Sequence, residues 1–513
     1  MPPFTGWCRR PRRLWTLSGS DDEVTLRRGG RKARTALRPS GPLRGSALLL
    51  TGQMSSKGFF VLSAMLLSRA LDDSSFGALA LFLSVGQVFL FFVDSGYSVV
   101  LNRKLSLAPG DLRKLLAPAL GARISLALAS LLSATAIALL AGLRAERVVL
   151  LGMILVAFSL EAVSENCFAV FRALERVGLE SASRLLSGGM GLLFIVLVVR
   201  WLPGPGTATA SYMFRSALMA IACILFLHGL GGGVAPSFRP GPVLATFRDS
   251  RHLWAMGMLM VCAQRLDTVV LRAFLSDQAV GAYQECYRIV DTLALVITPT
   301  LLPGSLFPRL CRAFEDGGEA AARMLGRIGS LVTGLALLAV PPLIAGGDGL
   351  MRLVWGPRFL RGQAPAEYQA CYLLCVLAIP LVFWMNTLLA SLLAAGRQRA
   401  ALRGAAGGLA VNLGANLLLV PGMGPTGSAL AMMITNAALS VFFAAGLSAR
   451  ERAGLPRELW RVLPGLAVSA TVIALGRSLP AGVVAGASAA AFTAAWLPLA
   501  GLRLLQRAAP GPS

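Results

Sequence analysis

The chain has 513 residues, of which 56% are hydrophobic and only 14% are charged, and its formal net charge is +24. A mean hydropathy of +0.69 excludes an ordinary water-soluble fold, because soluble domains carry more charge and less apolar surface. The apolar runs are continuous, which excludes a transmembrane β-barrel with its alternating strands. The composition therefore predicts an all-α protein with many membrane-spanning helices.

Residues 1–45 form a basic segment before the first apolar run. They contain ten arginines and Lys32, with a short acidic stretch at residues 21–23. The first hydrophobic run is too long for a secretory signal and has no small-residue cleavage site. We therefore expect a solvated, disordered arm, to which we assign no function.

Fourteen apolar runs are long enough to cross the roughly 30 Å of membrane hydrocarbon. In chain order, the predicted spans are 46–68, 77–98, 117–142, 147–170, 185–202, 208–230, 252–274, 278–303, 326–346, 368–394, 400–420, 426–447, 460–478 and 481–502. They predict two six-helix lobes, an N-lobe at 46–230 and a C-lobe at 252–447. A cytoplasmic linker at 231–251 joins the lobes, and 448–513 supplies two extra helices and a tail.

Basic residues recur in the loops on one side of the predicted bundle, in pairs such as Arg103 with Lys104 and Arg397 with Arg399. The loop at 420–427, on the other side, carries no charge. Cytoplasmic loops are enriched in Lys and Arg, so we expect both termini to be cytoplasmic. The positive charge is then explained by topology and by anionic lipid. No basic helix or aromatic-interleaved patch favours binding of nucleic acid.

Polar residues inside the first and fourth spans are candidate cavity residues. Lys57 has Gln53 one turn away on the same helical face, which predicts either a substrate contact or snorkelling to the inner interface. Glu161 and Glu165 also share a face at one-turn spacing. They predict a coupling-ion or proton site. The alternative is that they line the cytoplasmic end or pair with Arg172.

Three other charged residues lie near the ends of spans. Arg123 and Arg215 are expected to snorkel to the membrane boundary. Asp94 ends the second span and is expected to have a structural role with the basic loop that follows.

Two arginines in the seventh and eighth spans are the strongest functional candidates. Arg265 and Arg288 each lie ten residues from the turn between these spans, counted from Leu275 and Gln278. At about 1.5 Å per residue, both lie about 15 Å deep, near the bilayer midplane where alternating-access carriers bind substrate. A guanidinium costs about 2.5 kcal/mol or more in hydrocarbon, so the pair predicts an aqueous cavity. Arginine also binds phosphate through two parallel hydrogen bonds.

Three carboxylates accompany these arginines. Asp267 and Glu285 are predicted to lie slightly nearer the outer surface, and Asp291 slightly deeper. They are expected to line the cavity or to take part in ion coupling. The alternative is internal pairing, of Arg265 with Glu285 and of Arg288 with Asp291, which would neutralise both arginines.

The two lobes contain an internal repeat. A shift of 204 residues aligns LSRALDDSSFGA, which begins at Leu67, with LRAFLSDQAVGA, which begins at Leu271. Each stretch carries an Asp and a Gly at the turn between the first two helices of a lobe, on the predicted outer side. Because six helices separate the copies, the repeats are parallel, an arrangement that recurs in transporters.

Several short motifs follow one another through both lobes. An Arg-x-Leu turn closed by an aromatic-Gly pair occupies 69–77, and Asp94 precedes Gly96 at the end of the second span. RLDTVVLRAFLSDQAVGAYQECYRIVD, LVWGPRF, LLAAGRQRA and NLLLVPGMGPTGSALAMM follow in order. Over about residues 46–447, the chain resembles the oligosaccharide and polysaccharide flippases of the multidrug/oligosaccharidyl-lipid/polysaccharide exporter superfamily.

The resemblance implies two six-helix lobes around a central cavity, often with two extra C-terminal helices. It implies a flippase that moves a lipid-linked sugar of the undecaprenyl-diphosphate type, for lipopolysaccharide or exopolysaccharide, across the bacterial inner membrane by alternating access. Expected partners are this lipid, membrane lipid, H⁺ or Na⁺, and polysaccharide polymerases and glycosyltransferases. The first alternative is an organic-cation antiporter of the same superfamily. The second is a membrane glycosyltransferase or polymerase, although no acid/base pair stands on a predicted outer loop.

Metal and cofactor sites are not predicted. Cysteines are scattered through apolar helices, and the only histidines, His228 and His252, lie near the ends of spans. No cluster has the spacing of metal ligands, and no phosphate-binding GxxxxGK[ST] occurs. Interhelical hydrogen bonds are predicted for four asparagines of the second lobe, which are Asn386, Asn412, Asn416 and Asn436.

Overall fold

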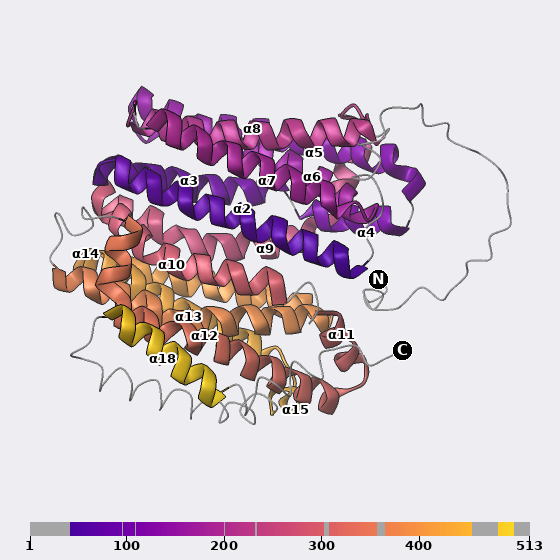
Figure 1. Cartoon of the computed structure of the whole chain (residues 1–513). Helices are drawn as coiled ribbons and strands as arrows, with labels where there is room; N and C mark the ends of the chain where they lie inside the picture. The colour runs from indigo at the N-terminus through magenta and orange to yellow at the C-terminus, as the bar shows by residue number, and fades with distance from the viewer. Residues whose placement is uncertain are drawn as a thin grey trace.

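A computed structural model describes residues 42–94, 96–107, 109–199, 201–230, 233–301, 307–355, 365–453 and 481–496. Within these ranges every regular element is a helix, which confirms the predicted all-α fold (Figure 1). The predicted arm at 1–45 lies outside the described residues except for its last four, which belong to the first helix. The predicted span at 460–478 also lies outside them.

The N-lobe occupies the upper half of Figure 1, in indigo to magenta. Its helices are α2 (Pro42–Ala70), α3 (Asp73–Asp94), α4 (Tyr97–Leu107), α5 (Leu112–Leu140), α6 (Ala145–Ala173), α7 (Val177–Phe194, continued by a π-helical turn at Ile195–Val199) and α8 (Pro205–Gly229). The short helix α4 was not predicted, because it is too short and too polar to cross a membrane.

Helix α7 begins well before its predicted start at 185, because charged residues in its first turns have partners. The carboxylate of Glu180 accepts hydrogen bonds from Arg172 Nη2 at 2.6 Å and from Arg184 Nε at 3.0 Å. Glu180 is fully buried. These charges lower the local hydropathy, so the sequence predicted a later start for this span. Paired charges are nevertheless tolerated inside a helical bundle.

The C-lobe occupies the lower half of Figure 1 and ends in yellow. Its helices are α9 (Pro240–Phe274), α10 (Asp277–Leu301), α11 (Phe307–Glu315), α12 (Gly318–Trp355), α13 (Pro365–Ala394), α14 (Gln398–Ala445), α15 (Ala449–Arg452) and α18 (Ala481–Trp496). Helix α9 starts inside the stretch predicted as a linker at 231–251. The helix α18 packs along α12.

Helix α14 contains the predicted span 400–420 and all but the last two residues of the predicted span 426–447. Between them Gly424 has φ 56° and ψ −134°, a backbone conformation that essentially only glycine adopts. The halves then run antiparallel, since Asn412 Nδ2 donates to Thr435 Oγ1 at 3.2 Å and Ser428 Oγ donates to Asn416 Oδ1 at 3.0 Å.

These two bonds confirm the predicted interhelical role of Asn412 and Asn416. For the other two asparagines the prediction was wrong, because each side chain donates to a carbonyl one turn back in its own helix. Asn386 bonds to Val382 and Asn436 to Met432, each at 2.8 Å.

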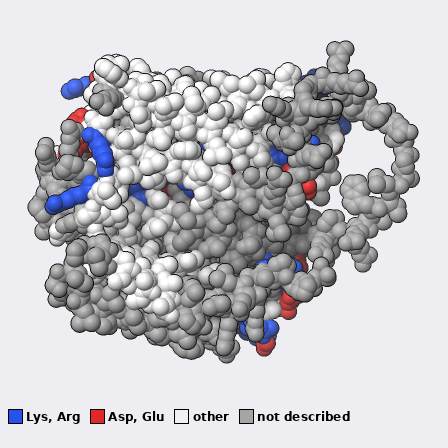
Figure 2. Space-filling view, in the orientation of Figure 1, with Lys and Arg blue, Asp and Glu red and all other residues white. Residues whose placement is uncertain are grey.

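Nine helices of the described ranges are long and apolar enough to cross a membrane. On the face in Figure 2, the described residues form a broad band that is nearly free of charged side chains, with Lys, Arg, Asp and Glu gathered towards its edges. An apolar band of this kind matches the hydrocarbon core of a bilayer. The protein is therefore a multi-pass membrane protein.

The two repeat turns lie against each other across the lobe interface. We call this end of the molecule, which holds residues 71–73 and 275–277, the repeat-turn end. A Cβ atom built on Gly77 of α3 would collide with the backbone carbonyl of Asp277 in α10. One built on Gly281 would lie 3.1 Å from the backbone oxygen of Asp73. The shared glycine of the repeat thus permits close backbone contact between the lobes.

Charged and aromatic side chains reinforce this contact between the lobes. Arg147 of α6 forms an ion pair of 2.8 Å with Asp277 of α10. Arg69 donates to the carbonyl oxygen of Leu353 in α12, and the rings of Phe76 and Trp355 lie 6.3 Å apart. The molecule is therefore closed at its repeat-turn end.

Candidate functional site

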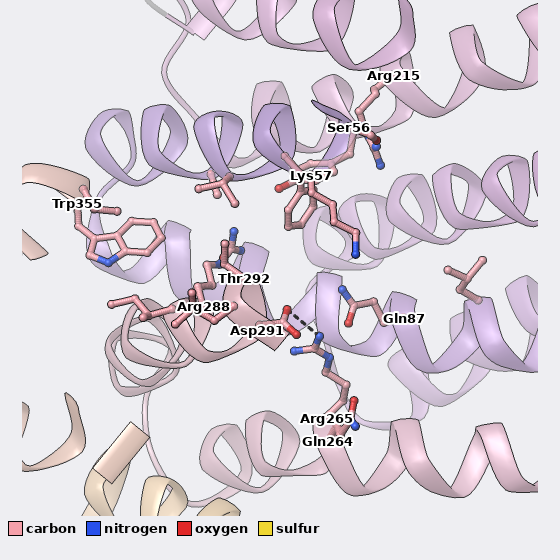
Figure 3. Close-up of a pocket in the computed structure, with 18 of the residues that line it drawn as sticks. Ser56, Lys57, Gln87, Arg215, Gln264, Arg265, Arg288, Asp291, Thr292 and Trp355 are labelled. Carbon is pink, nitrogen blue, oxygen red and sulfur yellow. Dashed lines mark hydrogen bonds and ion pairs between the residues drawn. The ribbon is translucent and has the colours of Figure 1, made fainter. Parts of the chain in front are cut away.

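A cavity of about 1130 Å³ lies between the two lobes. Its wall is built by α2, α3, α6 and α8 of the N-lobe and by α9, α10 and α12 of the C-lobe. Figure 3 shows side chains that extend into this space from both lobes. Its volume slightly exceeds that of typical ligand pockets, which measure about 300–1,000 Å³.

Positive charge dominates the polar part of the wall. Among the described residues that line the cavity, four are basic and two are acidic. The basic residues are Lys57, Arg215, Arg265 and Arg288, and the acidic ones are Glu161 and Asp291. Since low-dielectric walls strengthen such fields, the excess of two positive charges makes this cavity electrostatically suited to an anion.

Arg265 pairs with Asp291, which corrects the expected pairings. Its Nη2 donates to Asp291 Oδ2 at 3.1 Å, marked by the dashed line in Figure 3. Its guanidinium also lies over the Tyr287 ring, 5.3 Å from the centroid. The alternative of internal pairing thus holds for Arg265, but with Asp291 in place of Glu285, because the rotation of α9 and α10 brings Asp291 towards Arg265. The alternative pair of Arg288 with Asp291 was wrong.

Arg288 interacts across the lobe interface with aromatic rings. Its guanidinium lies 5.8 Å from the centroid of Phe60 and 5.5 Å from that of Phe76, both N-lobe residues. Within the described part of the chain, its buried Nη1 has no hydrogen-bond partner. A guanidinium held by rings keeps its hydrogen-bond donors available for an anionic group.

Glu161 and Arg215 form the ion pair of the N-lobe wall. Arg215 Nη2 donates to Glu161 Oε1, and Ser216 Oγ donates to the same oxygen at 3.2 Å. The expectation that Arg215 snorkels to the boundary was therefore wrong, because a carboxylate from another helix holds its charge inside the cavity.

Glu165, one turn from Glu161, belongs to a different cluster and does not line the cavity. Arg184 Nη2 donates to Glu165 Oε1 at 2.9 Å, and Arg172 Nη2 lies 3.8 Å from Glu165 Oε2. The anticipated pairing with Arg172 is thus present, but Arg184 is the nearer partner. Glu161 and Glu165 do not form one site.

Three other candidate residues lie away from the cavity wall. Gln53 and Glu285 are absent from the residues that line it. Asp267 is buried and accepts hydrogen bonds from Tyr283 Oη and from the backbone N–H of Thr268 at 2.7 Å. The Tyr283 bond joins α10 to α9, which gives Asp267 a structural role in this conformation.

Arg123 was also expected at the membrane boundary, and this was wrong. Its side chain is only 2% exposed, and it donates to the carboxylate of Asp94 and to the carbonyl oxygen of Ala162. A buried guanidinium needs such partners because its desolvation is costly. Asp94 therefore has a structural role, as expected, although its partner lies within the bundle.

Sequence reasoning overlooked several polar residues on the wall. Gln87, Tyr212, Gln264 and Trp355 line the cavity. Gln87 and Gln264 carried the signal of an uncharged polar residue inside an apolar helix. Tyr212 and Trp355 carried none, because a largely apolar aromatic side chain fits a lipid-facing or a buried position of a span as well as a cavity wall.

Comparisons with known proteins agree on the fold. The chain is similar to the lipid II flippase MurJ in an inward closed conformation, with a TM-score of 0.64 and 12% identity over 87% of this chain and 98% of that one. It is also similar to an inward-facing multidrug resistance MATE family transporter of the MOP superfamily, with a TM-score of 0.60 and 14% identity over 80% and 98%. A MOP superfamily transporter from Pyrococcus furiosus gives a TM-score of 0.58 and 12% identity over 82% and 98%. These likenesses establish a shared two-lobed fold.

A search among curated proteins gave no match. A family model described as polysaccharide biosynthesis protein matches residues 43–314, which is the whole N-lobe together with α9, α10 and most of α11. This match covers more than half of the 513 residues. The chain belongs to the polysaccharide biosynthesis protein family.

Proposed function

We propose that this protein is a flippase that carries a lipid-linked oligosaccharide or polysaccharide repeat unit across the bacterial inner membrane. The substrate class is a sugar joined by a diphosphate to a polyprenyl lipid such as undecaprenol. Membership of the polysaccharide biosynthesis family supports the sugar, and the MurJ-like fold supports a lipid carrier. The protein would act as a transporter, with no catalytic group and no cofactor.

The observation that carries the proposal is the excess of positive charge in the inter-lobe cavity. A diphosphate brings two negative groups, and guanidinium donors bind phosphate oxygens in pairs. Arg288 supports this role best because rings, rather than a carboxylate, hold its guanidinium. Lys57 and Arg265 extend into the same space (Figure 3).

The same charge argues against the organic-cation alternative. A carrier of cations gains affinity from a net acidic cavity, whereas a cation here would meet an excess of basic side chains. The fold does not separate the two functions, because both a lipid II flippase and multidrug transporters share it. Charge at the site is therefore the property on which the choice depends.

Alternating access provides the transport mechanism. With the repeat-turn end placed outside, the closed contact between Gly77 and Asp277 seals the cavity from the outer face. The headgroup would enter from the cytoplasmic side while the polyprenyl tail remains in lipid. Rocking of the two lobes would open the repeat-turn end and close the opposite one.

We further propose a driving force for transport, a set of partner enzymes and a membrane orientation. A carrier without a nucleotide site would draw on a H⁺ or Na⁺ gradient, or on consumption of the product outside the membrane. Glycosyltransferases that build the lipid-linked sugar and a polymerase that consumes it are the expected partners. The distribution of basic loops supports a cytoplasmic position for both termini.

Reconstituted transport tests the proposal. Proteoliposomes would be loaded with a fluorescent undecaprenyl-diphosphate oligosaccharide, and its appearance in the outer leaflet would be measured for wild type, Arg265→Gln and Arg288→Gln. Loss of charge-assisted hydrogen bonds, at about 1.5–3 kcal/mol each, predicts at least a tenfold loss of transport efficiency for Arg288→Gln. Arg323→Gln, an exposed residue of α12 outside the cavity, is the matched control.

Thermal melts would show that each variant is folded to the same extent as wild type, so that transport is compared at equal amounts of folded protein. Unchanged transport in both cavity variants would remove the proposed site. Transport of an organic cation, with no transport of the lipid-linked sugar, would favour the antiporter instead.

A further inference from the structure

Four buried hydrogen-bond donors on the cavity wall have no partner within the described part of the chain. They are Tyr212 Oη, Arg215 Nε, Arg288 Nη1 and Trp355 Nε1. Buried donors left without an acceptor cost free energy, so each one calls for a partner such as a ligand or an ordered water. Four such donors around one cavity are consistent with a ligand rich in oxygen acceptors.

These donors fall into two groups with different chemistry. Arg288 and Trp355 belong to the C-lobe, and Phe76, which contacts both, lies between them. Tyr212 and Arg215 belong to α8 of the N-lobe, where a spacing of three residues places them on one helical face. Figure 3 shows Arg215 and Arg288 entering the space from opposite lobes.

The N-lobe group combines donors with an acceptor. Within the described residues, the hydrogen bonds that Glu161 receives from Arg215 and Ser216 both end on its Oε1. Its Oε2 therefore remains as an acceptor for a ligand in the cavity. Tyr212 contributes a hydroxyl, and Phe60 packs edge-on against its ring at 6.0 Å. We call Glu161, Tyr212, Arg215 and Ser216 the N-lobe cluster.

A mixed cluster of this kind suits hydroxyl groups better than phosphate. Phosphate oxygens at neutral pH mainly accept hydrogen bonds, and the carboxylate of Glu161 would repel them. A sugar hydroxyl both donates and accepts, so it can bond to Glu161 and to Tyr212 or Arg215 together. The rings of Phe60 and Phe158 on the same wall offer apolar surface to the C–H face of a sugar.

We propose that the N-lobe cluster is a sugar subsite, which binds hydroxyl groups of the headgroup while Arg288 binds the diphosphate. This inference rests on the proposed function and divides its substrate between the two lobes. The N-lobe cluster would then decide which sugars are carried. Arg288 would bind any polyprenyl diphosphate, whatever sugar it carries.

Binding of two probes to the purified full chain in nanodiscs tests the division. One probe is undecaprenyl diphosphate, and the other is undecaprenyl diphosphate that carries a disaccharide. The quenching of Trp355 fluorescence, isolated by difference from a Trp355→Phe protein, would report occupancy of the cavity. The variants are Tyr212→Phe, Glu161→Gln and Arg288→Gln, with Tyr97→Phe as a matched control in the core of the N-lobe, away from the cavity.

We expect Tyr212→Phe and Glu161→Gln to weaken binding of the disaccharide probe about tenfold. Tyr212→Phe should leave undecaprenyl diphosphate binding unchanged, whereas Glu161→Gln should leave it unweakened or strengthen it, because it removes a negative charge from the cavity. Arg288→Gln should weaken both probes, and Tyr97→Phe neither. Equal weakening of both probes by Tyr212→Phe, or weakening of neither, would overturn the sugar subsite and leave the proposed function standing. Binding of neither probe by wild type would instead overturn the proposed function, and the subsite with it.

A structural explanation is excluded by a second measurement. Glu161→Gln removes the ion-pair partner of Arg215 and could lower stability, so the melting temperature of each variant would be recorded. Tyr212→Phe removes only a hydroxyl that has no partner within the described residues. Its folding should therefore be unaffected, which makes it the decisive variant.

Discussion

Gly77 of the first repeat lies directly against the backbone carbonyl of Asp277 in the second, and a side chain at position 77 has no room. Gly281 meets the backbone of Asp73 in the reciprocal way. Because helices α3 and α10 begin at these turns, the contact closes the cavity at one end by backbone packing. Small residues at this interface therefore control whether the lobes can close.

Gly77→Val should prevent closure at the repeat-turn end, because its Cβ and methyl groups would occupy the space of the Asp277 carbonyl. In a cysteine-free background with Ser56→Cys on the cavity wall, a membrane-impermeant maleimide added from the repeat-turn side should label the protein several-fold faster. Gly58→Val is the control, since a Cβ there meets no atom within 4 Å. An unchanged labelling rate would show that the contact does not seal the cavity.

Arg147→Gln should favour opening of the same end, because it removes the ion pair of Arg147 with Asp277 between the lobes. A partly exposed pair contributes about 1 kcal/mol, so maleimide labelling should rise about fivefold. Arg272 pairs with the same carboxylate at 2.6 Å but belongs to the same lobe. Arg272→Gln should therefore leave the labelling rate unchanged. An equal effect of the two substitutions would contradict the view that the Arg147–Asp277 ion pair holds the lobes together.

Arg123→Met should destabilise the N-lobe without changing the cavity. Removal of the guanidinium leaves the Asp94 carboxylate without its buried partner, and breaking a buried pair costs about 3–5 kcal/mol. The melting temperature in detergent should fall strongly, whereas the double variant Arg123→Met with Asp94→Asn should recover part of the loss. A double variant less stable than the single one would argue against this pairing.

Acid should weaken the contact between Arg397 and Glu451 next to helix α14. Burial raises the pKa of Glu451, but hydrogen bonds from Ser448 and the charge of Arg397 outweigh it, and the pKa is lowered overall. The contact therefore contributes fully above the ordinary glutamate pKa of 4.5, and its contribution is lost as pH falls through the lowered pKa.

Melting temperatures of wild type and Glu451→Gln, measured between pH 3 and pH 7, would test this sign. The two curves should converge at the acidic end and separate towards neutral pH, with wild type more stable. Arg397 Nη1 and Nη2 each donate to Glu451 at 2.9 Å, so Arg397→Gln should give the same convergence. A constant difference across the range would contradict the pKa argument.

Several features of this protein were readable from the order of its residues. Apolar runs of spanning length predicted the helices, because hydrocarbon demands about 20 apolar residues in a row. The cost of a guanidinium in lipid was enough to make Arg265 and Arg288 cavity candidates. The repeated Asp and Gly of the two turns identified the internal repeat, whereas the contact between these turns was not predicted.

The partners of the charged residues were not readable in the same way. The rotation of a helix about its axis decides which carboxylate an arginine reaches, and a shift of one residue turns a side chain by about 100°. Arg265 therefore reaches Asp291 rather than Glu285, and Arg215 reaches Glu161 across 54 positions of chain. The sequence contains no local signal for either pair.

Composition and apolar runs were sufficient for the helical membrane class and for most of the described helices, because the membrane selects for hydropathy in each helix separately. The cavity and its N-lobe cluster arise only when seven helices from both lobes pack together. Tyr212 and Trp355 face that space because of how α8 and α12 pack, and packing depends on residues far away in the chain.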